Sequence, residues 1–222
     1  MRPSVIMAVR HGESEANLAH RLAGDRPLVY ERGDDEVTVT ELGRAQAAAF
    51  GRLLAALPHD EAPELVCCSP YRRARDTWRI AQETWGAAPP PVVVDDRLRD
   101  QEQGAFAGRN LAALRERFPD ELARREAAGA YAFRPPGGES LADVTVRLRA
   151  FLADDLGGRA DGRRVLIVAH DSVVLGLRHV LGGRPDTELS AVLAFAPVLN
   201  GSVSVWRAGE LVRFNDVAHL TS

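Results

Sequence analysis

The chain has 222 residues, of which 45% are hydrophobic and 27% charged, and its formal net charge is −3. This composition is typical of one soluble globular domain that is long enough to bury a full core. No segment approaches the roughly 18 consecutive apolar residues of a membrane helix, and the apolar run 4–9 is too short for a signal peptide, so we expect a cytoplasmic protein. The two cysteines, Cys67 and Cys68, are adjacent, which excludes a disulfide framework and a zinc knuckle.

All 28 residues counted as lysine or arginine are arginine, because the sequence contains no lysine. The absence of lysine excludes a P-loop nucleotide site and Schiff-base chemistry. Arginine remains available to bind phosphate or carboxylate groups. The near-neutral charge and the 6% aromatic content argue against nucleic-acid binding, so we expect a small anion as the partner. The sequence predicts no oligomeric state.

The first part of the chain begins with a short apolar run. This run, 4–9, predicts a strand that is buried on both faces. Residues 19–37 are rich in glycine and charge and predict a long loop. A helix then follows from an N-cap at Thr40 and ends before Pro58.

The next part repeats the order of strand and helix. Residues 65–68 predict a second buried strand. The dipeptide Ser69-Pro70 favours a helix start, with Ser69 as the N-cap and Pro70 at the first helical position, and this helix should reach about Trp85. Residues 92–94 predict a third strand.

Helical patterns follow around 111–117 and 121–127. The prolines and glycines of 135–138 break the chain, and another helix begins at Glu139 or Ser140.

The last part contains the clearest buried strand, 165–169, which ends at His170. A helix over about 172–181 follows it, and the chain closes with a hairpin of strands at 203–207 and 211–214.

This alternation of strands and helices predicts an α/β three-layer sandwich with a mostly parallel central sheet and right-handed crossovers. We interpret residues 1–222 as a single domain, because no repeat or low-complexity linker divides the chain. The segments at about 19–37 and 98–140 are each long enough to cover a pocket, and we predict that they form lids.

Polar residues gather where the first strand ends, in the sequence R-H-G-E-S-E-A-N. His11 follows Arg10 there, and Gly12 permits a tight turn. Ser14 and Asn17 carry short polar side chains that can donate to a phosphate oxygen. The segment resembles the opening R-H-G-E-S-x-x-N signature of the histidine phosphatase superfamily, the phosphoglycerate-mutase-like enzymes, and Asn17 matches that signature.

The resemblance covers essentially the whole chain, because later blocks of that family recur in order. The matching motifs are T-x-x-G-x-x-Q-A, S-P-L-x-R-A-x-Q-T, L-x-E-x-x-x-G and G-G-E-S, at residues 40–47, 69–77, 98–104 and 137–140. The second of these blocks maps the family's second phosphate arginine onto Arg73, and the last strand supplies the second histidine, His170. The resemblance implies a phosphoglycerate-mutase-like fold.

These residues form a chemically coherent set. A neutral imidazole at His11 can attack phosphorus and form a phosphohistidine, which divides one displacement into two. Arg10 and Arg73 can clamp the phosphoryl oxygens, and His170 can add a donor. The arginines should lower the pKa of His11 and keep its ring unprotonated. We therefore predict catalysis without a metal ion or a cofactor.

The leaving group needs a carboxylic acid, and Asp100 and Glu102 both qualify, because residues two apart in an extended segment share a face. The resemblance aligns Asp100 with the family's glutamate and so favours Asp100 as the acid/base, although aspartate is one methylene shorter. Glu102 stays open as the alternative acid or as a substrate-binding residue. Neighbouring arginines should lower the pKa of the acid, and we expect the incoming phosphate dianion to reverse this effect.

Two further carboxylates flank the predicted site. Asp171 stands where the family usually has glycine, and we interpret it as a helix cap that points away from the phosphate. We interpret Glu13 as an ion-pair partner that supports the arginines rather than as a catalytic residue.

We predict a metal-independent phosphomonoester hydrolase that acts through phospho-His11 on a small phosphorylated metabolite. A phosphoglycerate-type phosphomutase is the alternative. In the family, cofactor-dependent mutases carry a longer insertion with lysine and arginine after the acid block, whereas this chain has no lysine and a shorter loop. A catalytically silent phosphate-binding module of the same fold also stays open, because Asp100 replaces the family's glutamate.

Overall fold

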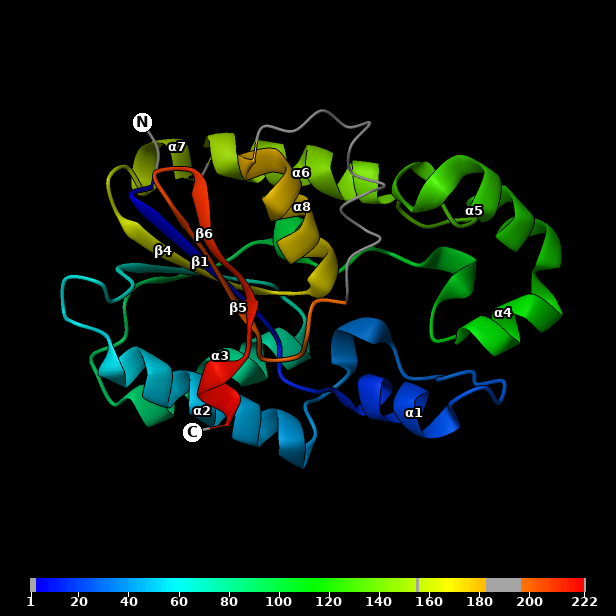
Figure 1. Ribbon diagram of the computed structural model, residues 1–222, viewed down its shortest axis with the longest axis horizontal. Helices are drawn as coiled ribbons and strands as arrows, with labels where there is room; N and C mark the ends of the chain where they lie inside the picture. Colours follow the sequence, from blue (N-terminus) through cyan, green and yellow to red (C-terminus); the bar gives the residue numbers. More distant parts are fainter. Residues whose placement is uncertain (1–2, 155, 183–196, 222) are drawn as a thin grey trace.

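A computed structural model describes residues 3–154, 156–182 and 197–221. Within these residues, six strands form one central sheet in the order β3-β2-β4-β1-β5-β6 (Figure 1). The strands are β1 (Val5–Arg10), β2 (Leu65–Cys68), β3 (Val92–Val94), β4 (Arg164–Ala169), β5 (Val203–Arg207) and β6 (Glu210–Asp216). The first four strands run parallel, and the β5–β6 hairpin adds two antiparallel strands beside β1. The predicted α/β fold with a mostly parallel sheet is confirmed.

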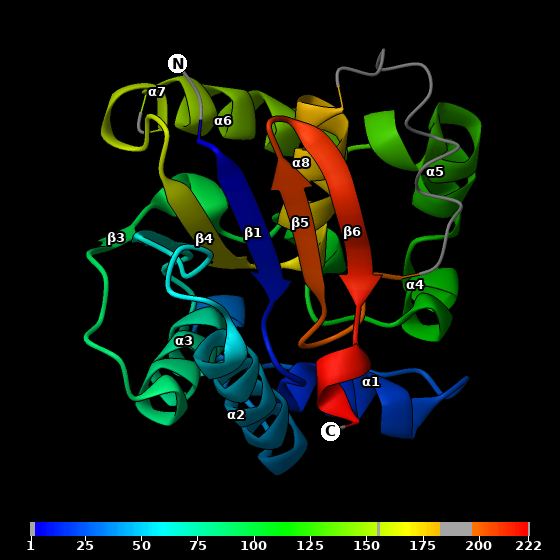
Figure 2. The same cartoon turned by 60° about the vertical axis from the view of Figure 1, so that its left-hand side comes forward.

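Helices cover both faces of the sheet (Figure 2). Helices α2 (Glu41–Ala56) and α3 (Arg72–Trp85) pack on one face. Helices α6 (Leu141–Asp154) and α8 (Asp171–Leu181) pack on the other.

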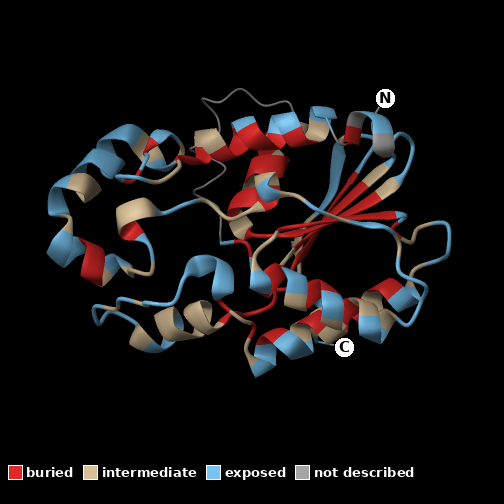
Figure 3. Cartoon of the chain, turned by 180° about the vertical axis from the view of Figure 1, so that it is seen from behind, coloured by how far each residue is buried: buried red, intermediate tan, exposed pale blue. Residues whose placement is uncertain are grey.

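Strand β4 lies between these two helical layers and shows how both faces are filled. Leu166 and Val168 belong to the core under α2 and α3, whereas Val165 and Ile167 belong to the core under α6 and α8. Because successive side chains of a strand point to opposite faces, a strand buried on both sides needs an unbroken apolar run, as the sequence has there. In Figure 3 the buried residues are concentrated along the sheet and on the helix faces that contact it.

The remaining helices lie outside this sandwich or at its edge. They are α1 (Glu15–Ala23), α4 (Leu111–Arg117), α5 (Pro119–Ala132) and α7 (Leu156–Arg159). Phe106, Leu114 and Phe133 form a small separate core around α4 and α5. No helix in the described part of the chain has both the length and the apolar character needed to cross a membrane.

The two segments predicted as lids contact each other. Tyr30 N donates to Gly108 O at 2.8 Å, and Leu28 N donates to the side-chain Oδ1 of Asn110 at 3.0 Å. These bonds join the segment 19–37 to the segment 98–140 on the side of the sheet where α1 and α4 lie (Figure 1).

The expected loop over 19–37 is wrong at its start, because α1 extends to Ala23. This helix begins at a capping box formed by Ser14 and Asn17, which fixes its first turn although none of the residues of the helix is buried. The later residues of the segment contain a one-turn 3-10 helix, η1 (Asp34–Glu36).

Two other expected helix starts also differ. Helix α3 begins at Arg72 rather than at Pro70, and the Ser69 hydroxyl lies 2.8 Å from His170 Nε2 while its oxygen accepts from Tyr71 N. Helix α5 is longer than the expected 121–127 and contains a kink at Gly129, whose φ of 77° is in the left-handed region that favours glycine.

Candidate active site

The two histidines predicted to share a site lie at the carboxyl ends of adjacent strands. Strands β1 and β4 pair in parallel with Arg10 opposite Ala169, so His11 and His170 follow them side by side. The ring centroids of these histidines are 5.3 Å apart in an edge-to-face arrangement. Arg73, from the first turn of α3, donates from Nε to Nε2 of His11 at 3.1 Å. The structure therefore brings Arg73 and both histidines into one cluster.

The ring of His11 has a defined orientation. Its Nδ1 lies 2.8 Å from Gly12 O and must donate there, because a carbonyl oxygen can only accept. This leaves the lone pair of Nε2 directed at Arg73. Burial lowers the pKa of His11 well below its ordinary value, and the nearby Arg73, Arg10 and His170 lower it further. The result is a neutral imidazole whose Nε2 carries no proton, the state that a nucleophile requires, and in the empty site the lone pair of this Nε2 accepts from Arg73.

Two residues that the sequence analysis did not single out hold the turn around His11. Gly12 N donates to Thr77 Oγ1 at 3.0 Å, and the Thr77 hydroxyl donates to Arg73 O at 2.7 Å. Asn200 Nδ2 donates to His11 O at 3.1 Å. These bonds connect the turn to α3 on one side and to the segment before β5 on the other.

The same turn packs against α2 through two glycines. A Cβ atom added to Gly43 would lie 2.1 Å from Glu13 O, and one added to Gly12 would lie 2.3 Å from Gly43 O. Gly43→Ala should therefore push α2 away from the turn and lower the free energy of unfolding by about 1–3 kcal/mol, the usual cost of overpacking. Urea denaturation measures this loss. The control is Gly158→Ala, whose Cβ meets no atom within 4 Å, and equal stability of the two variants would contradict the packing.

Arg10, at the end of β1, has a buried donor without a partner among the described residues. Its Nη1 donates to Val198 O, and its Nη2 lies 3.8 Å from Asp171 Oδ2. Its Nε is buried and has no hydrogen-bond partner among the described residues. A buried guanidinium N–H without an acceptor is suited to an oxyanion ligand.

The prediction that Asp171 points away from the site is wrong, although its Oδ1 does accept from the backbone N–H of Ser172 at 3.0 Å, as an interaction at the start of a helix would. Asp171 is the first residue of α8, and His170 occupies the N-cap position. Oδ2 of Asp171 lies on the side of Arg10, because Asp171 comes two residues after the end of β4 and Arg10 ends the neighbouring strand β1.

Asp100 joins the cluster from the segment after β3. Its Oδ2 accepts from Arg73 Nη2 at 2.9 Å and lies 3.5 Å from His170 Nδ1. Its Oδ1 accepts from the Ser172 hydroxyl at 2.6 Å. Burial alone would raise the pKa of this carboxyl. His170, Arg73 and the hydrogen bond from Ser172 outweigh burial, and the pKa of the carboxyl lies well below its usual range.

Glu102, the other candidate acid, lies in different surroundings. Its carboxylate is half exposed and accepts from Arg99 Nε at 3.1 Å. The structure therefore places Asp100, and not Glu102, in contact with Arg73 and His170. The sequence spacing could not distinguish Asp100 from Glu102, because the two carboxylates differ in their contacts with Arg73 and Ser172, which are distant in the sequence.

His170 is fully buried between three elements. Its Nε2 lies 2.8 Å from the Ser69 hydroxyl, and its Nδ1 has no hydrogen-bond partner in the part of the chain that the structure describes. Burial lowers the pKa of His170 to about 3, with Arg73 acting in the same direction and Asp100 in the opposite one. His170 is therefore neutral in the free protein, and it can direct a donor into the site.

Ser14 and Asn17 form the capping box of α1. The Ser14 hydroxyl donates to Asn17 Oδ1 at 2.9 Å, so its single proton is already used. The Nδ2 of Asn17 donates to no described residue and stays available. The prediction that Glu13 pairs with the arginines of the cluster is wrong. Glu13 accepts from Arg21 at 2.8 Å instead.

Two further residues border the cluster without having been predicted. Asp34, in η1, accepts from both terminal nitrogens of Arg73.

The ring of Tyr71 lies 5.2 Å from that of His170, measured between centroids, and 5.0 Å from the guanidinium carbon of Arg73. Burial raises the pKa of Tyr71 to about 12, with Asp34 and Asp100 adding to this effect, so its phenol is neutral. The sequence offered a signal for Tyr71, which lies inside the S-P-x-x-R block, but none for Asp34.

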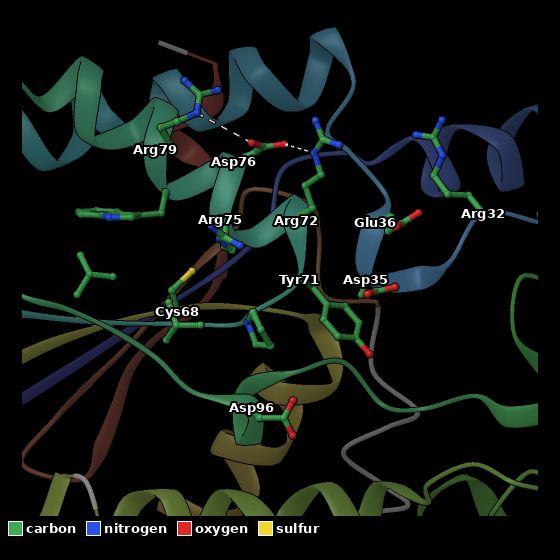
Figure 4. A pocket seen from close by; sticks show the side chains of 14 residues that line it. Arg32, Asp35, Glu36, Cys68, Tyr71, Arg72, Arg75, Asp76, Arg79 and Asp96 are labelled. Carbon is green, nitrogen blue, oxygen red and sulfur yellow. Dashed lines mark ion pairs between the residues drawn. The ribbon is translucent and has the colours of Figure 1, made fainter.

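A cavity of about 1070 Å³ opens beside Tyr71 (Figure 4). Residues of η1, α3 and β3 line it, and many of them are charged. The charged ones are Arg32, Asp35, Glu36, Arg72, Arg75, Asp76, Arg79 and Asp96. Of the residues at the cluster, Tyr71 lines this cavity, whereas the two histidines, Arg73 and Asp100 do not.

The cations of the cluster are arginines. Within residues 3–154, 156–182 and 197–221, no group of three or more histidine, cysteine, aspartate or glutamate side chains is placed to bind a metal ion. The arrangement can hold an oxyanion between Arg10 and Arg73 and present the Nε2 of His11 to it.

Comparison with known proteins assigns the family. A model of the histidine phosphatase superfamily (branch 1) matches residues 6–210. The chain belongs to the histidine phosphatase superfamily. The chain is an enzyme of this superfamily, a phosphatase or a mutase.

Relatives of both kinds exist within the superfamily. A 2,3-bisphosphoglycerate-dependent phosphoglycerate mutase 2 from Gloeobacter violaceus is 33% identical over 77% of this chain and 72% of its own length. The 2,3-bisphosphoglycerate-dependent phosphoglycerate mutase of Methylobacterium radiotolerans is 30% identical over 90% of this chain and 92% of its own. Among solved structures, mycobacterial glucosyl-3-phosphoglycerate phosphatase in complex with VO3 is 27% identical, with a TM-score of 0.75 over 98% of this chain and 100% of that one. The similarities do not separate a mutase from a phosphatase.

Proposed function

We propose that the protein is a phosphomonoester hydrolase that acts through phospho-His11 on a small phosphorylated metabolite. The observation that carries the proposal is the geometry of His11, whose Nδ1 is bound to Gly12 O and whose Nε2 faces Arg73. A phosphoryl group that binds Arg73 and takes the place of its Nε–H contact with His11 would face the lone pair of Nε2.

In the first step, Nε2 of His11 forms a bond to phosphorus while the bond between phosphorus and the ester oxygen breaks. Arg10 and Arg73 stabilise the charge on the phosphoryl oxygens, and His170 donates from Nδ1. Asp100 supplies a proton to the leaving oxygen. The low pKa of Asp100 in the free protein opposes this role, and the bound phosphate dianion, by taking up the arginine charge, raises the pKa again.

In the second step, water attacks phosphorus and the bond to Nε2 of His11 breaks. Asp100, now ionised, accepts a proton from that water, so that inorganic phosphate leaves and the original protonation states return. Asn17 directs its free Nδ2 at a phosphoryl oxygen.

A phosphomutase is the second candidate, because the curated relatives cited above are mutases at 30–33% identity. A mutase returns the phosphoryl group of His11 to an acceptor hydroxyl instead of to water. We favour hydrolysis because the chain has no lysine and only a short loop after the acid block, and because the phosphatase cited above matches nearly the whole fold.

Two assays with the same preparation decide between the candidates. Phosphate release from p-nitrophenyl phosphate and from a panel of phosphorylated metabolites measures hydrolysis. The assay contains EDTA, and we expect activity to persist in it, because arginines supply the positive charge that a metal ion would otherwise supply. Conversion of 3-phosphoglycerate in the presence of 2,3-bisphosphoglycerate measures mutase activity. We expect hydrolysis to exceed conversion. Conversion without hydrolysis would assign a mutase, and the absence of both would assign a silent binding module.

Hydrolysis should persist at acidic pH. Because the pKa of His11 lies well below its ordinary value, the ring stays neutral as the pH falls through 6.5, where an exposed histidine becomes protonated. The value of kcat/KM for an aryl phosphate, corrected for the ionisation of the ester, should therefore stay level between about pH 7.5 and 5.5. A decline with a midpoint near the ordinary histidine pKa would contradict the electrostatic description of this residue.

A further inference from the structure

Every donor of Arg73 is occupied in this structure. A guanidinium carries five N–H groups. The one on Nε points to His11, and the two on Nη1 point to the backbone oxygen and to Oδ1 of Asp34. The two on Nη2 point to Oδ2 of Asp34 at 3.2 Å and to Oδ2 of Asp100 at 2.9 Å. Arg73 therefore has no N–H left for a phosphoryl oxygen.

The carboxylate of Asp34 takes the position that a phosphoryl group requires. It accepts from Nη1 and Nη2 together, the two-pronged geometry with which arginine also binds phosphate. Arg10, by contrast, keeps a buried Nε without a partner among the described residues. One of the two predicted phosphate arginines is therefore open, and the other is covered by an anion from the protein itself.

Asp34 is able to leave this position. It lies in the single turn of η1, and its side chain is 53% exposed, whereas that of Arg73 is 4% exposed. Partial burial raises the pKa of Asp34, and Asp100 raises it further, although Arg73 acts in the opposite direction. The carboxylate is thus crowded by a second carboxylate on the same guanidinium, and a third anion cannot bind there without repulsion.

We propose that Asp34 is a resident competitor for the phosphate site, which occupies Arg73 in the empty enzyme and which the phosphoryl group of the substrate must displace. The proposal rests on the proposed function, because it needs Arg73 to bind phosphate. Asp34 then sets the affinity for phosphate: substrate binding includes the loss of the Asp34–Arg73 contacts, and the segment that carries η1 must shift when the site fills.

A permanent positioning role of Asp34 makes the opposite prediction. If Asp34 held Arg73 in its binding orientation throughout the reaction, its removal would weaken phosphate binding. If Asp34 competes, its removal strengthens phosphate binding. The sign of the change therefore separates the two roles.

Titration calorimetry with inorganic phosphate, at a pH where the dianion prevails, tests the proposal. The variants are Asp34→Asn and, as a second replacement that also removes the charge, Asp34→Ser. Asp25→Asn is the matched control, because it removes one exposed aspartate from the same segment. We expect both Asp34 variants to bind phosphate about 10-fold more tightly than the wild type, because that factor corresponds to the free energy of one charged hydrogen-bonded contact. The affinity of Asp25→Asn for phosphate should equal that of the wild type.

Equal or weaker phosphate binding by the Asp34 variants would overturn the proposal. Arg73→Gln distinguishes this failure from a failure of the proposed function. If Arg73→Gln loses phosphate binding while Asp34→Asn fails to strengthen it, the phosphate site stands and the competitor does not. If Arg73→Gln binds phosphate as the wild type does, the proposed phosphate site itself is wrong, and the proposal on Asp34 falls with it.

Discussion

His11→Ala should reduce the hydrolysis of p-nitrophenyl phosphate by about 10⁴-fold or more, because it removes the protein atom that forms a bond to phosphorus in the proposed mechanism. The loss should appear with good and poor leaving groups alike, since every substrate passes through the same phosphohistidine. Steady-state phosphate release measures it.

The matched control for this substitution is His59→Ala, which removes an exposed histidine far from any predicted site residue in the sequence. It should leave turnover at the wild-type level. Circular dichroism must show that His11→Ala is folded, because His11 is only 2% exposed and its loss leaves a small cavity. A folded His11→Ala protein that keeps a tenth of the wild-type activity would contradict the assignment of the nucleophile.

Asp100→Asn should lower the turnover of an alkyl phosphate by about 10²–10⁴-fold, the usual contribution of a general acid. The substitution keeps the shape of the side chain but removes the proton that the leaving oxygen requires. An aryl phosphate with a good leaving group needs little protonation, so His11 should still be phosphorylated. Attack by water should then become slow, and phosphoenzyme should accumulate.

Glu102→Gln is the control for the choice of acid. Because the carboxylate of Glu102 pairs with Arg99 and is half exposed, this variant should stay near wild-type activity with both substrates. The opposite result would be a loss of activity in Glu102→Gln that depends on the leaving group, together with normal activity in Asp100→Asn. That result would assign the general acid to Glu102 instead of Asp100.

The residues at the strand ends could be predicted from the sequence because their placement depends on short-range patterns. The apolar runs before Arg10 and before His170 define two buried strands, and parallel strands that pair bring their carboxyl ends together. Arg73 could be located because it lies inside a recognisable block at the start of a helix.

Other features of the site depend on contacts between distant segments, which a sequence pattern does not encode. Ser69 has the residue type and the neighbouring proline of an N-cap, but its hydroxyl also contacts His170, 101 residues away, and the helix begins only at Arg72. Asp34 lies in a charged stretch without periodicity, so nothing local indicates that η1 folds over Arg73. The choice between Asp100 and Glu102 also required the position of Ser172 on α8.

The proposed function depends above all on a covalent intermediate at His11. Rapid quenching of the wild-type enzyme with a radiolabelled phosphate ester, followed by mass spectrometry of the peptide that contains residue 11, tests this intermediate directly. We predict a phosphoryl group on His11 that is lost in acid and kept in base, as a phosphorus–nitrogen bond requires, and that is absent from His11→Ala. A label that is stable in acid, or one that persists in His11→Ala, would contradict the mechanism.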